Sequence, residues 1–282
     1  MSGQGGVDSA TLLQGPWETP AARAGLAGCL EGLELRGLLP ADHLAVICVG
    51  SVARGWANDG SDYDFNVIAP GPWHGPSART IPVPLRPGTV PSAVEYVDGR
   101  RWEVKYWLDI QVEQMLAKVS WSEFEQGGAA ARALTDAEEL FLERLSTCIT
   151  LSGASWVRGK RQALARTAFR AFVTTRSLVE ADEAVEDALG QLAAGDTDSA
   201  VLSAHKAFGH VVDALLESHG VYGSRTPKWR ARRLGEARPR QLSYADYWSV
   251  ETMRDLDPDH PAAWVTQVVQ RCRDLSIEVE IH

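Results

Sequence analysis

The stretch from Val46 to Ile68 constrains the fold more than any other part of this 282-residue chain. It begins inside an apolar, β-branched run, 44–49, which is short enough to be a buried strand. Gly50-Ser51 interrupts that run, and 52–57 is predicted to form one or two turns of helix. After a short polar loop, a second strand is predicted over 62–68. Two strands therefore enclose a polar junction.

The polar residues of this stretch suggest a metal and phosphate site. Alternate side chains of a strand share one face, so Asp62 and Asp64 are expected to point the same way. Two adjacent carboxylates repel each other unless a cation lies between them, and Mg²⁺ with its oxygen ligands suits the arrangement. Gly50 and Ser51, at a strand-to-helix junction, offer backbone N–H groups and a hydroxyl to a phosphate. The spacing predicts a site for a metal–nucleoside triphosphate complex.

In this order, Gly50-Ser51 and Asp62-Tyr63-Asp64 resemble the signature of the polymerase-β-like nucleotidyltransferases. The sequence Val52–Gly55 is similar to the small-molecule branch, which contains the aminoglycoside and lincosamide nucleotidyltransferases. Taken alone, the two aspartates would also suit a solvated acidic turn, and Gly50-Ser51 would also suit a chance pair. The resemblance implies two Mg²⁺ ions on the aspartates, with ATP or another nucleoside triphosphate as co-substrate. It also implies that Gly50, Ser51 and Arg54 bind the nucleotide.

The remaining pattern predicts an α+β fold with a catalytic domain over 1–130 and an all-helical domain over 131–282. The catalytic domain is expected to hold a small mixed sheet, and the resemblance places the active site in the cleft between the two domains. A hairpin is predicted over 93–107, around the tight-turn signal Asp98-Gly99. Other expectations are poor order over 1–19, helices over 20–36, 110–118, 135–151, 160–192, 198–219, 227–234, 243–256 and 260–275, and an irregular, proline-rich loop over 69–92. No strand is expected after Ile110.

A third carboxylate is expected from the second strand of the hairpin. Alternation puts Glu103, Lys105 and Trp107 on one face, and the bulky apolar residues on the other. In the family resembled, the third carboxylate comes from a strand paired beside the two-aspartate strand, and Glu103 occupies that position. It would complete the metal site or accept the proton of the attacking hydroxyl. Asp109 and Glu95 are the competing residues, and a surface-facing Glu103–Lys105 edge is the structural alternative.

A basic stretch, Tyr222–Arg240, stands out in an acidic chain. A triphosphate is an obvious counter-charge, so Lys228, and after it Arg225, are predicted to contact the β- and γ-phosphates. A solvated helix end and a nucleic-acid patch are the alternatives. The acidic run 180–187 would suit a cationic substrate, or would be a solvated helix face. His205 and His210 are off the i, i+4 spacing of a helical metal pair and are interpreted as structural.

Charge and composition narrow the possible partners and the compartment. The net charge is 28 − 37 = −9, which argues against nucleic acid as a partner and favours a neutral or cationic small molecule. No apolar stretch approaches the ~20 residues of a membrane span, and the N-terminus lacks a secretory pattern. The four cysteines form no CxxC pair. A reduced, cytoplasmic protein is expected, and its oligomeric state is not predicted.

The expected function is transfer of a nucleoside monophosphate, AMP first, from Mg²⁺–nucleoside triphosphate to a hydroxyl of a small molecule, with release of pyrophosphate. An aminoglycoside-type antibiotic and a biosynthetic metabolite are equally compatible acceptors. Two alternatives come from other classes. One is a nucleotidyltransferase acting on a protein or RNA, as an AMP-transferring enzyme or part of a toxin–antitoxin pair. The other is a non-catalytic nucleotide-binding relative.

Overall fold

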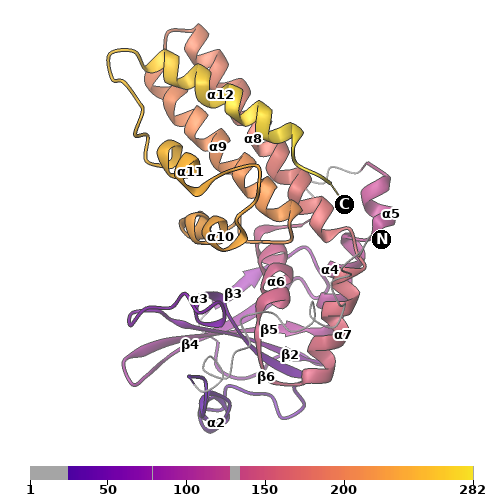
Figure 1. Cartoon of the computed structure of the whole chain (residues 1–282). Coiled ribbons are helices and arrows are strands. Elements are labelled where there is room, and N and C mark those ends of the chain that lie inside the picture. Colours follow the sequence, from indigo (N-terminus) through magenta and orange to yellow (C-terminus); the bar gives the residue numbers. More distant parts are fainter. Residues whose placement is uncertain (1–24, 78, 128–133, 282) are drawn as a thin grey trace, which may run out of the picture. The chain divides into compact units, whose positions relative to one another are not determined.

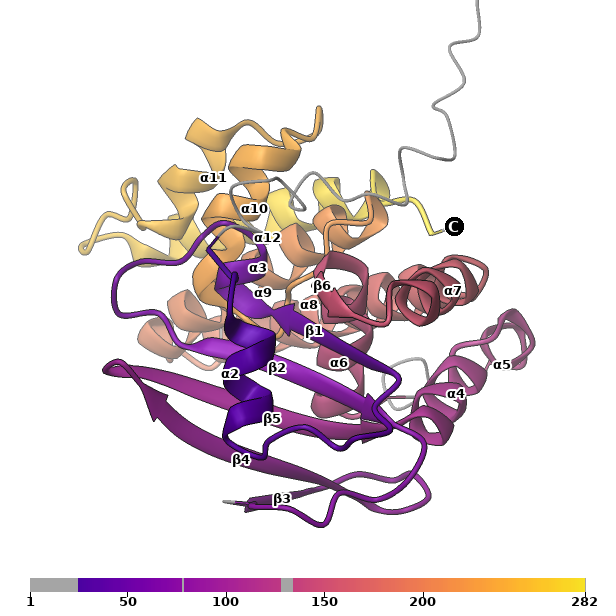
Figure 2. The same cartoon turned by 90° about the horizontal axis from the view of Figure 1, so that it is seen from below.

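The structure is a computed structural model that describes residues 25–77, 79–127 and 134–281. Within these residues a six-stranded mixed sheet (Figure 1) has the order β3-β4-β5-β2-β1-β6, which can be followed in Figure 2. Helices follow it, so the predicted α+β class is confirmed. The strands are β1 (Ala45–Val49), β2 (Tyr63–Ala69), β3 (Arg79–Pro82), β4 (Thr89–Val97), β5 (Arg100–Leu108) and β6 (Ile149–Ser152).

The centre of the sheet is a parallel pair, β2 and β5, flanked by antiparallel neighbours. The predicted strands over 44–49 and 62–68 are confirmed as β1 and β2, joined by the one-turn helix α3 (Gly50–Ala53) and a loop. The predicted hairpin is confirmed as β4 and β5. Its turn residues, Asp98 and Gly99, have positive φ angles of 50° and 78°, as a tight hairpin turn requires.

The two faces of the sheet differ in chemistry. On one face Trp102, Val104 and Tyr106 belong to an apolar core with helix α2 (Cys29–Leu35). The other face carries Asp64 of β2 and Arg101, Glu103 and Lys105 of β5, and helix α6 (Asp136–Thr147) lies over it. Figures 1 and 2 show α2 and α6 on opposite sides of the sheet. The predicted alternation along β5 is therefore confirmed, and the polar face is the one that can hold a site.

The chain divides into two compact units. Among the described residues, the first comprises 25–77, 79–118 and 134–167, and the second comprises 119–127 and 168–281. This division differs from the predicted boundary at residue 130, because α6, β6 and α7 (Ala154–Ala165) fold with the sheet. The first unit also contains helix α4 (Asp109–Lys118), which was predicted over 110–118.

The second unit is helical. Its core joins the long helices α8 (Phe169–Ala193), α9 (Thr197–Ser218) and α12 (Pro261–Ile277), which run side by side in Figure 1. The apolar residues that recur at helical spacing along α9 are all buried: Val201, Ala204, Phe208, Val211, Val212 and Leu215. The shorter elements are α5 (Trp121–Glu125), η2 (Pro227–Trp229), α10 (Arg230–Ala237) and α11 (Tyr244–Glu251).

The prediction of an irregular loop over 69–92 was wrong in part. β3 and the first residues of β4 lie within it, with Thr80 opposite Pro91. β3 is an edge strand that pairs with β4 alone, so a proline that lacks an N–H can be tolerated there. The prolines concealed the strand because their number is typical of loops.

Two further predictions were wrong. Strands do not stop at Ile110, because Ile149–Ser152 forms β6 against β1. The first three of these residues fall in the end of the helix predicted over 135–151. The capping box of that helix, Thr135 with Glu138, is present. The helix predicted over 160–192 is two helices, α7 and α8. Between them Thr167 Oγ1 donates to the carbonyl of Leu164, and the Ala168 N–H donates to Val119, which interrupts the helical ladder.

In the described part of the helix predicted over 20–36, helix α2 begins at Cys29, after Gly28, whose φ is 81°. Residues 1–19, expected to be poorly ordered, lie outside the described residues, as do 20–24. In the part of the chain that is described, no helix combines the length and apolar character needed to span a bilayer. All four cysteines are buried and free.

Candidate active site

Gly50 and Asp64 lie against each other at the end of β1. Val49 pairs with Asp64 across the antiparallel β1–β2 ladder, so the next residue, Gly50, comes beside the carboxylate. Gly50 has a φ of 76°, and a Cβ there would lie 2.6 Å from Asp64 Oδ2. Backbone conformation and close approach therefore both require glycine. The two halves of the sequence signature meet at this point.

Three carboxylates share the polar face of the sheet. Asp64 of β2 lies directly opposite Glu103 of β5 in the parallel register. Asp62 precedes β2 by one residue and is linked to Glu103 through Arg101: Arg101 Nη1 donates to Asp62 Oδ2 at 2.7 Å, and Nη2 to Glu103 Oε2 at 2.9 Å. The structure thus brings all three predicted carboxylates to one region.

Glu103 is surrounded by cations. Besides Arg101, Arg79 Nη2 donates to Glu103 Oε1 at 2.6 Å, and Lys105 Nζ lies 3.3 Å from the same oxygen. Burial opposes ionisation, but Lys105, Arg101 and Arg79 together lower the pKa of Glu103 to about 2. Glu103 therefore stays a carboxylate throughout the physiological range.

Asp64 has a different environment. Burial raises the pKa of Asp64, and the nearby carboxylates of Glu103 and Asp62 act in the same direction against the cations Arg144 and Lys105. Its nearest charged partner is Arg144, with Nη2 4.0 Å from Oδ2, and no hydrogen bond to its carboxylate is found within the described residues. Asp64 thus has ligand oxygens available and gains from a nearby cation.

The donor set suits a hard divalent ion. Among the described residues, no three His, Cys, Asp or Glu side chains are grouped closely enough to hold a metal as they stand. Arg101 lies between Asp62 and Glu103, where it supplies the positive charge that these carboxylates need. The oxygens of Asp64, the partly exposed Asp62 and the ionised Glu103 are of the type that Mg²⁺ prefers. Binding would require Arg101 to move aside.

Beyond the carboxylates, the same face forms a small pocket in the first unit. Its floor is the next register pair, Asn66 and Lys105, followed by Trp107. Its other walls come from Ile81 of β3 and from α6. Phe141 of α6 packs on Trp107 with ring centroids 4.8 Å apart. The residues of α6 that line the pocket are Ala137, Leu140, Phe141 and Arg144, which share one helix face.

The predicted nucleotide-binding residues near Gly50 have distinct surroundings. Ser51 lies in α3, which has only four residues, so individual backbone N–H groups and the hydroxyl matter here rather than a helix dipole. Arg54 donates to Glu143 Oε1 at 3.1 Å in an almost fully buried ion pair, and its guanidinium lies 4.8 Å from the centroid of Trp56. This pairing connects Arg54 to α6.

The two competitors for the third carboxylate lie elsewhere. Asp109, at the start of α4, accepts hydrogen bonds from Trp156 Nε1 and Lys160 Nζ, both at 2.8 Å. Burial opposes the ionisation of Asp109, but these two hydrogen bonds lower its pKa. Glu95 is exposed on β4, opposite Trp102. Neither shares the position of Glu103 opposite Asp64.

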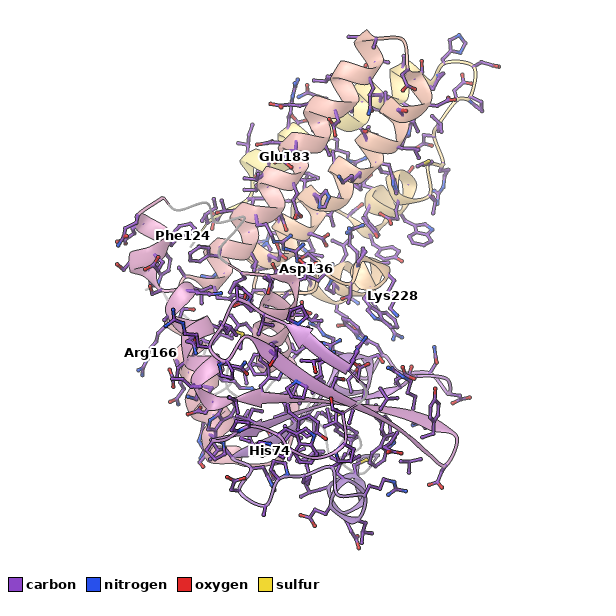
Figure 3. All side chains as sticks on the ribbon, turned by 180° about the vertical axis from the view of Figure 1, so that it is seen from behind. His74, Phe124, Asp136, Arg166, Glu183 and Lys228 are labelled. Carbon is purple, nitrogen blue, oxygen red and sulfur yellow. The ribbon has the colours of Figure 1, made fainter. Side chains whose placement is uncertain are left out.

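The predicted phosphate-binding residues of the basic stretch belong to the helical unit. Lys228 of η2 is exposed and lies over the Trp229 ring at 5.5 Å (Figure 3). Arg225 Nη1 lies 3.6 Å from Glu180 Oε1. Their contact with a triphosphate stays a prediction. Much of the stretch is paired inside this unit, since Arg230 and Arg233 both donate to buried Asp213.

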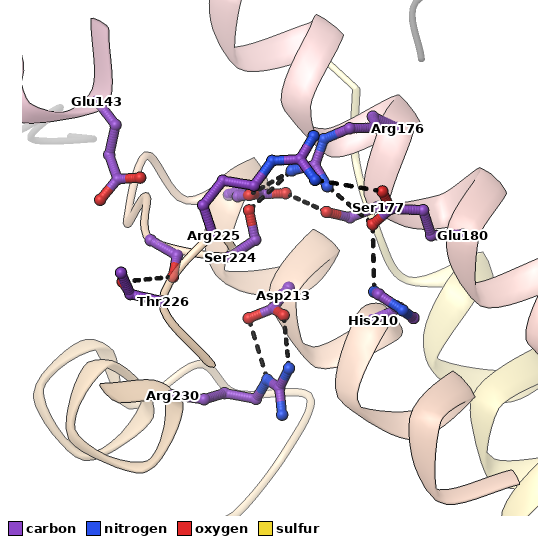
Figure 4. A network of polar contacts seen from close by, with 12 residues as sticks. Glu143, Arg176, Ser177, Glu180, His210, Asp213, Ser224, Arg225, Thr226 and Arg230 are labelled. Carbon is purple, nitrogen blue, oxygen red and sulfur yellow. Dashed lines mark hydrogen bonds and ion pairs between the residues drawn. The ribbon is translucent and has the colours of Figure 1, made fainter. Parts of the chain in front are cut away.

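The acidic run of α8 separates into two kinds of residue. Glu180 joins a polar network with Arg176 and His210, at 2.8 and 3.2 Å (Figure 4). The other members are exposed, as on a solvated helix face: Asp182, Glu183, Glu186 and Asp187. The two histidines have separate partners, His205 the carbonyl of Glu251 and His210 the carboxylate of Glu180, in agreement with a structural role.

Sequence reasoning missed four residues around the carboxylates. Arg101 and Arg79 both bond Glu103, and Asn66 and Arg144 line the pocket. The period-2 rule could have placed Asn66 with Asp62 and Asp64. Nothing in the local pattern signals Arg144, because its position depends on how α6 crosses the sheet.

Comparison with known proteins identifies no family: no family model matches the chain, and no curated protein matches it. Among solved structures, it is similar to the crystal structure of a nucleotidyltransferase-like protein from Exiguobacterium sibiricum 255-15. The two share 11% sequence identity and a TM-score of 0.48, over 89% of this chain and 74% of that one. The likeness is too weak to support a function, which has to be argued from the site.

Proposed function

We propose that this protein is a Mg²⁺-dependent nucleotidyltransferase of the polymerase-β-like kind, in its small-molecule branch. It would move a nucleoside monophosphate, AMP first, from a nucleoside triphosphate to a hydroxyl of a small molecule. The observation that carries the proposal is the meeting of Gly50, Asp64 and Glu103. Gly50 touches Asp64 across one ladder, and Glu103 lies opposite Asp64 across the other.

The residues fit distinct roles in this reaction. Asp62, Asp64 and Glu103 would hold the ions, which would neutralise the phosphates and stabilise the charge that develops on them. The Ser51 hydroxyl and nearby backbone N–H groups would bind phosphate oxygens beside Asp64. The acceptor hydroxyl oxygen forms a bond to the α-phosphorus as the bond to the pyrophosphate oxygen breaks. The hydroxyl proton passes to water.

Glu103 is better suited to hold a cation than to accept a proton. A general base works best with a pKa near the operating pH, whereas the pKa of Glu103 is about 2. Its three cationic neighbours keep it ionised. We therefore assign Glu103 a ligand role rather than the alternative role of general base.

The proposal is tested by measuring pyrophosphate release with Mg²⁺ and each nucleoside triphosphate. The acceptors are hydroxyl-bearing acids, neutral sugars, amino sugars, a protein mixture and RNA, and mass spectrometry identifies the product. We expect a small-molecule product heavier by one nucleoside monophosphate, and none with Asp64→Asn at unchanged melting temperature. Product on protein or RNA alone would contradict the small-molecule assignment. Nucleotide binding with no transfer to any acceptor would favour a non-catalytic relative.

A further inference from the structure

The pocket beside the carboxylates has an unusual combination of walls. Its sides are mostly apolar, from Ile81, Trp107, Leu140 and Phe141. At one end two cations, Lys105 and Arg144, come together. Its volume is about 80 Å³, enough for a small charged group and a short apolar body, since one water needs ~10–15 Å³ of such space.

The two cations of the pocket have spare hydrogen-bond donors. Arg144 has the 4.0 Å ion pair with Asp64 and makes no hydrogen bond within the residues described. Lys105 has three N–H donors and one partner, Glu103, at 3.3 Å. Both side chains are largely buried, with exposed fractions of 16% and 18%. The indole Nε1 of Trp107 is also buried and has no hydrogen-bond partner in the described part of the chain.

The charge of the surrounding face favours an anion. Among the described residues of this face, four cations, Arg79, Arg101, Lys105 and Arg144, accompany the three carboxylates, which leaves 4 − 3 = +1. Any Mg²⁺ on the carboxylates would take their charge away from Lys105 and Arg144. Both would then require a new anionic partner, because unpaired buried charges are costly.

The position of the pocket relates it to the reaction. Asn66 and Lys105 follow Asp64 and Glu103 by two residues along parallel strands, which corresponds to ~6.6 Å at ~3.3 Å per residue. A molecule with its anionic group at Lys105 and Arg144 could therefore extend a hydroxyl toward the carboxylates. Its apolar middle would lie against Trp107 and Phe141.

We propose that this pocket binds the acceptor, and that the acceptor carries a carboxylate or phosphate group held by Lys105 and Arg144. That the ligand is the acceptor of the reaction rests on the proposed function, but binding of the ligand can be measured without catalysis. It replaces the cationic acceptor expected from the overall net charge. We infer the charge of the acceptor from the cations that line the pocket and not from the net charge of the chain, because the acidic residues of α8 belong to the other compact unit.

The test uses three probes of similar size that each carry a para-hydroxyl: 4-hydroxybenzoate, its neutral methyl ester, and tyramine. Ligand-observed NMR titration gives each Kd with Mg²⁺ and no nucleotide. We expect the acid to bind at least about tenfold more tightly than the ester or the amine. A fourth probe, 4-hydroxyphenyl phosphate, is titrated in the same way. The lower Kd of this phosphate and 4-hydroxybenzoate shows which anionic group the pocket prefers. Tyramine or the ester binding as tightly as both acids would overturn the proposal.

Variants then assign the pocket. Arg144→Gln should weaken binding of the tighter acid about tenfold and leave the ester unchanged, whereas Arg144→Lys should stay within about threefold of the unmodified protein. Acid binding that is unchanged in Arg144→Gln would overturn the assignment. The assignment would also be overturned if Arg144→Gln weakened nucleotide binding and left acid binding unchanged, because the nucleotide phosphates would then occupy the pocket. Pyrophosphate release is measured separately, so a failure of the proposed transfer is distinguished from a failure of this pocket.

Discussion

The two units each contain a cluster of arginines and carboxylates, but the clusters differ in balance. In the helical unit, four arginines face four carboxylates in ion pairs: Arg176, Arg225, Arg230 and Arg233 with Glu180, Asp213, Glu217 and Glu251. On the sheet, four cations accompany three carboxylates, and Asp64 and Arg144 approach no closer than 4.0 Å.

The difference indicates what each cluster is for. A balanced cluster pairs its charges with one another and holds helices together. An unbalanced cluster beside a pocket leaves donors and acceptors for a ligand, which is typical of functional sites. The balance of positive and negative charges, together with their pairing, distinguishes the two clusters.

The largest expected effect comes from breaking the balanced cluster. Asp213 is 1% exposed and accepts hydrogen bonds from both Arg230 and Arg233, so Asp213→Ala leaves two buried guanidinium groups without their carboxylate. We expect the free energy of unfolding to fall by about 3–5 kcal/mol, measured by urea denaturation. The matched control is Asp246→Ala, whose exposed pair with Arg271 should cost less than about 1 kcal/mol. Equal losses in the two variants would contradict the structural role of the cluster.

A glycine pair tests the link between backbone and site. Gly50 and Gly55 both have positive φ, 76° and 67°, but only at Gly50 would a Cβ meet Asp64. Each change to alanine should cost about 1–2 kcal/mol of stability from backbone strain. Only Gly50→Ala should in addition lower the rate of nucleotide transfer, about a hundredfold, because it displaces the carboxylate. Similar rates in the two variants would remove Gly50 from the site.

The low pKa of Glu180 gives the helical cluster a pH dependence. Burial opposes ionisation, but His210, Arg176 and Arg225 lower the pKa of Glu180 to about 2, from 4.5. Because the folded-state pKa is the lower one, this stabilisation is present above pH ~4.5 and is lost as the pH falls toward ~2. Glu180→Gln should therefore lower stability at neutral pH and flatten the fall of stability between these pH values. Denaturation curves across this range measure it, and an unchanged slope would contradict the assignment.

The smallest expected effect concerns Arg101, which bridges Asp62 and Glu103. Its side chain is 29% exposed, so Arg101→Ala should change stability by less than about 1 kcal/mol. Mg²⁺ affinity without nucleotide should increase about three- to tenfold, because a competing cation is removed. Isothermal titration calorimetry measures this change. A weaker affinity for Mg²⁺ would mean that Arg101 orients the carboxylates rather than competing for them.

Local patterns predicted a substantial part of this molecule. The Asp98-Gly99 turn and the alternation along β5 depend on neighbouring residues, so the sequence was sufficient to place Glu103 on the polar face. β3 was missed because edge strands tolerate proline, and β6 because four residues between helices carry little periodicity. The break between α7 and α8 depends on the Val119 carbonyl, which is far away in the sequence.

The polar face was predictable in its carboxylates and not in its cations. The pairing of Asp62 with Asp64 follows from spacing within one strand, and the choice of Glu103 follows from alternation along β5 together with the family resemblance. The ion pair of Arg79 with Glu103 depends on the sheet order, and the approach of Arg144 to Asp64 depends on how α6 crosses it. Such contacts join residues far apart in the chain, and no local rule anticipates them.

The most direct test of the account is Mg²⁺-dependent nucleotide binding by the polar face. Calorimetry with a non-hydrolysable ATP analogue, with Mg²⁺ or with EDTA, compares the unmodified protein with Asp64→Asn. Asp109→Asn serves as the control, because Asp109 lies away from Glu103 and bonds Trp156. We predict that Mg²⁺ strengthens binding at least about tenfold in the unmodified and control proteins. This gain should vanish in Asp64→Asn at an unchanged free energy of unfolding. An equal gain in Asp64→Asn would contradict the central claim that these carboxylates form a metal–nucleotide site.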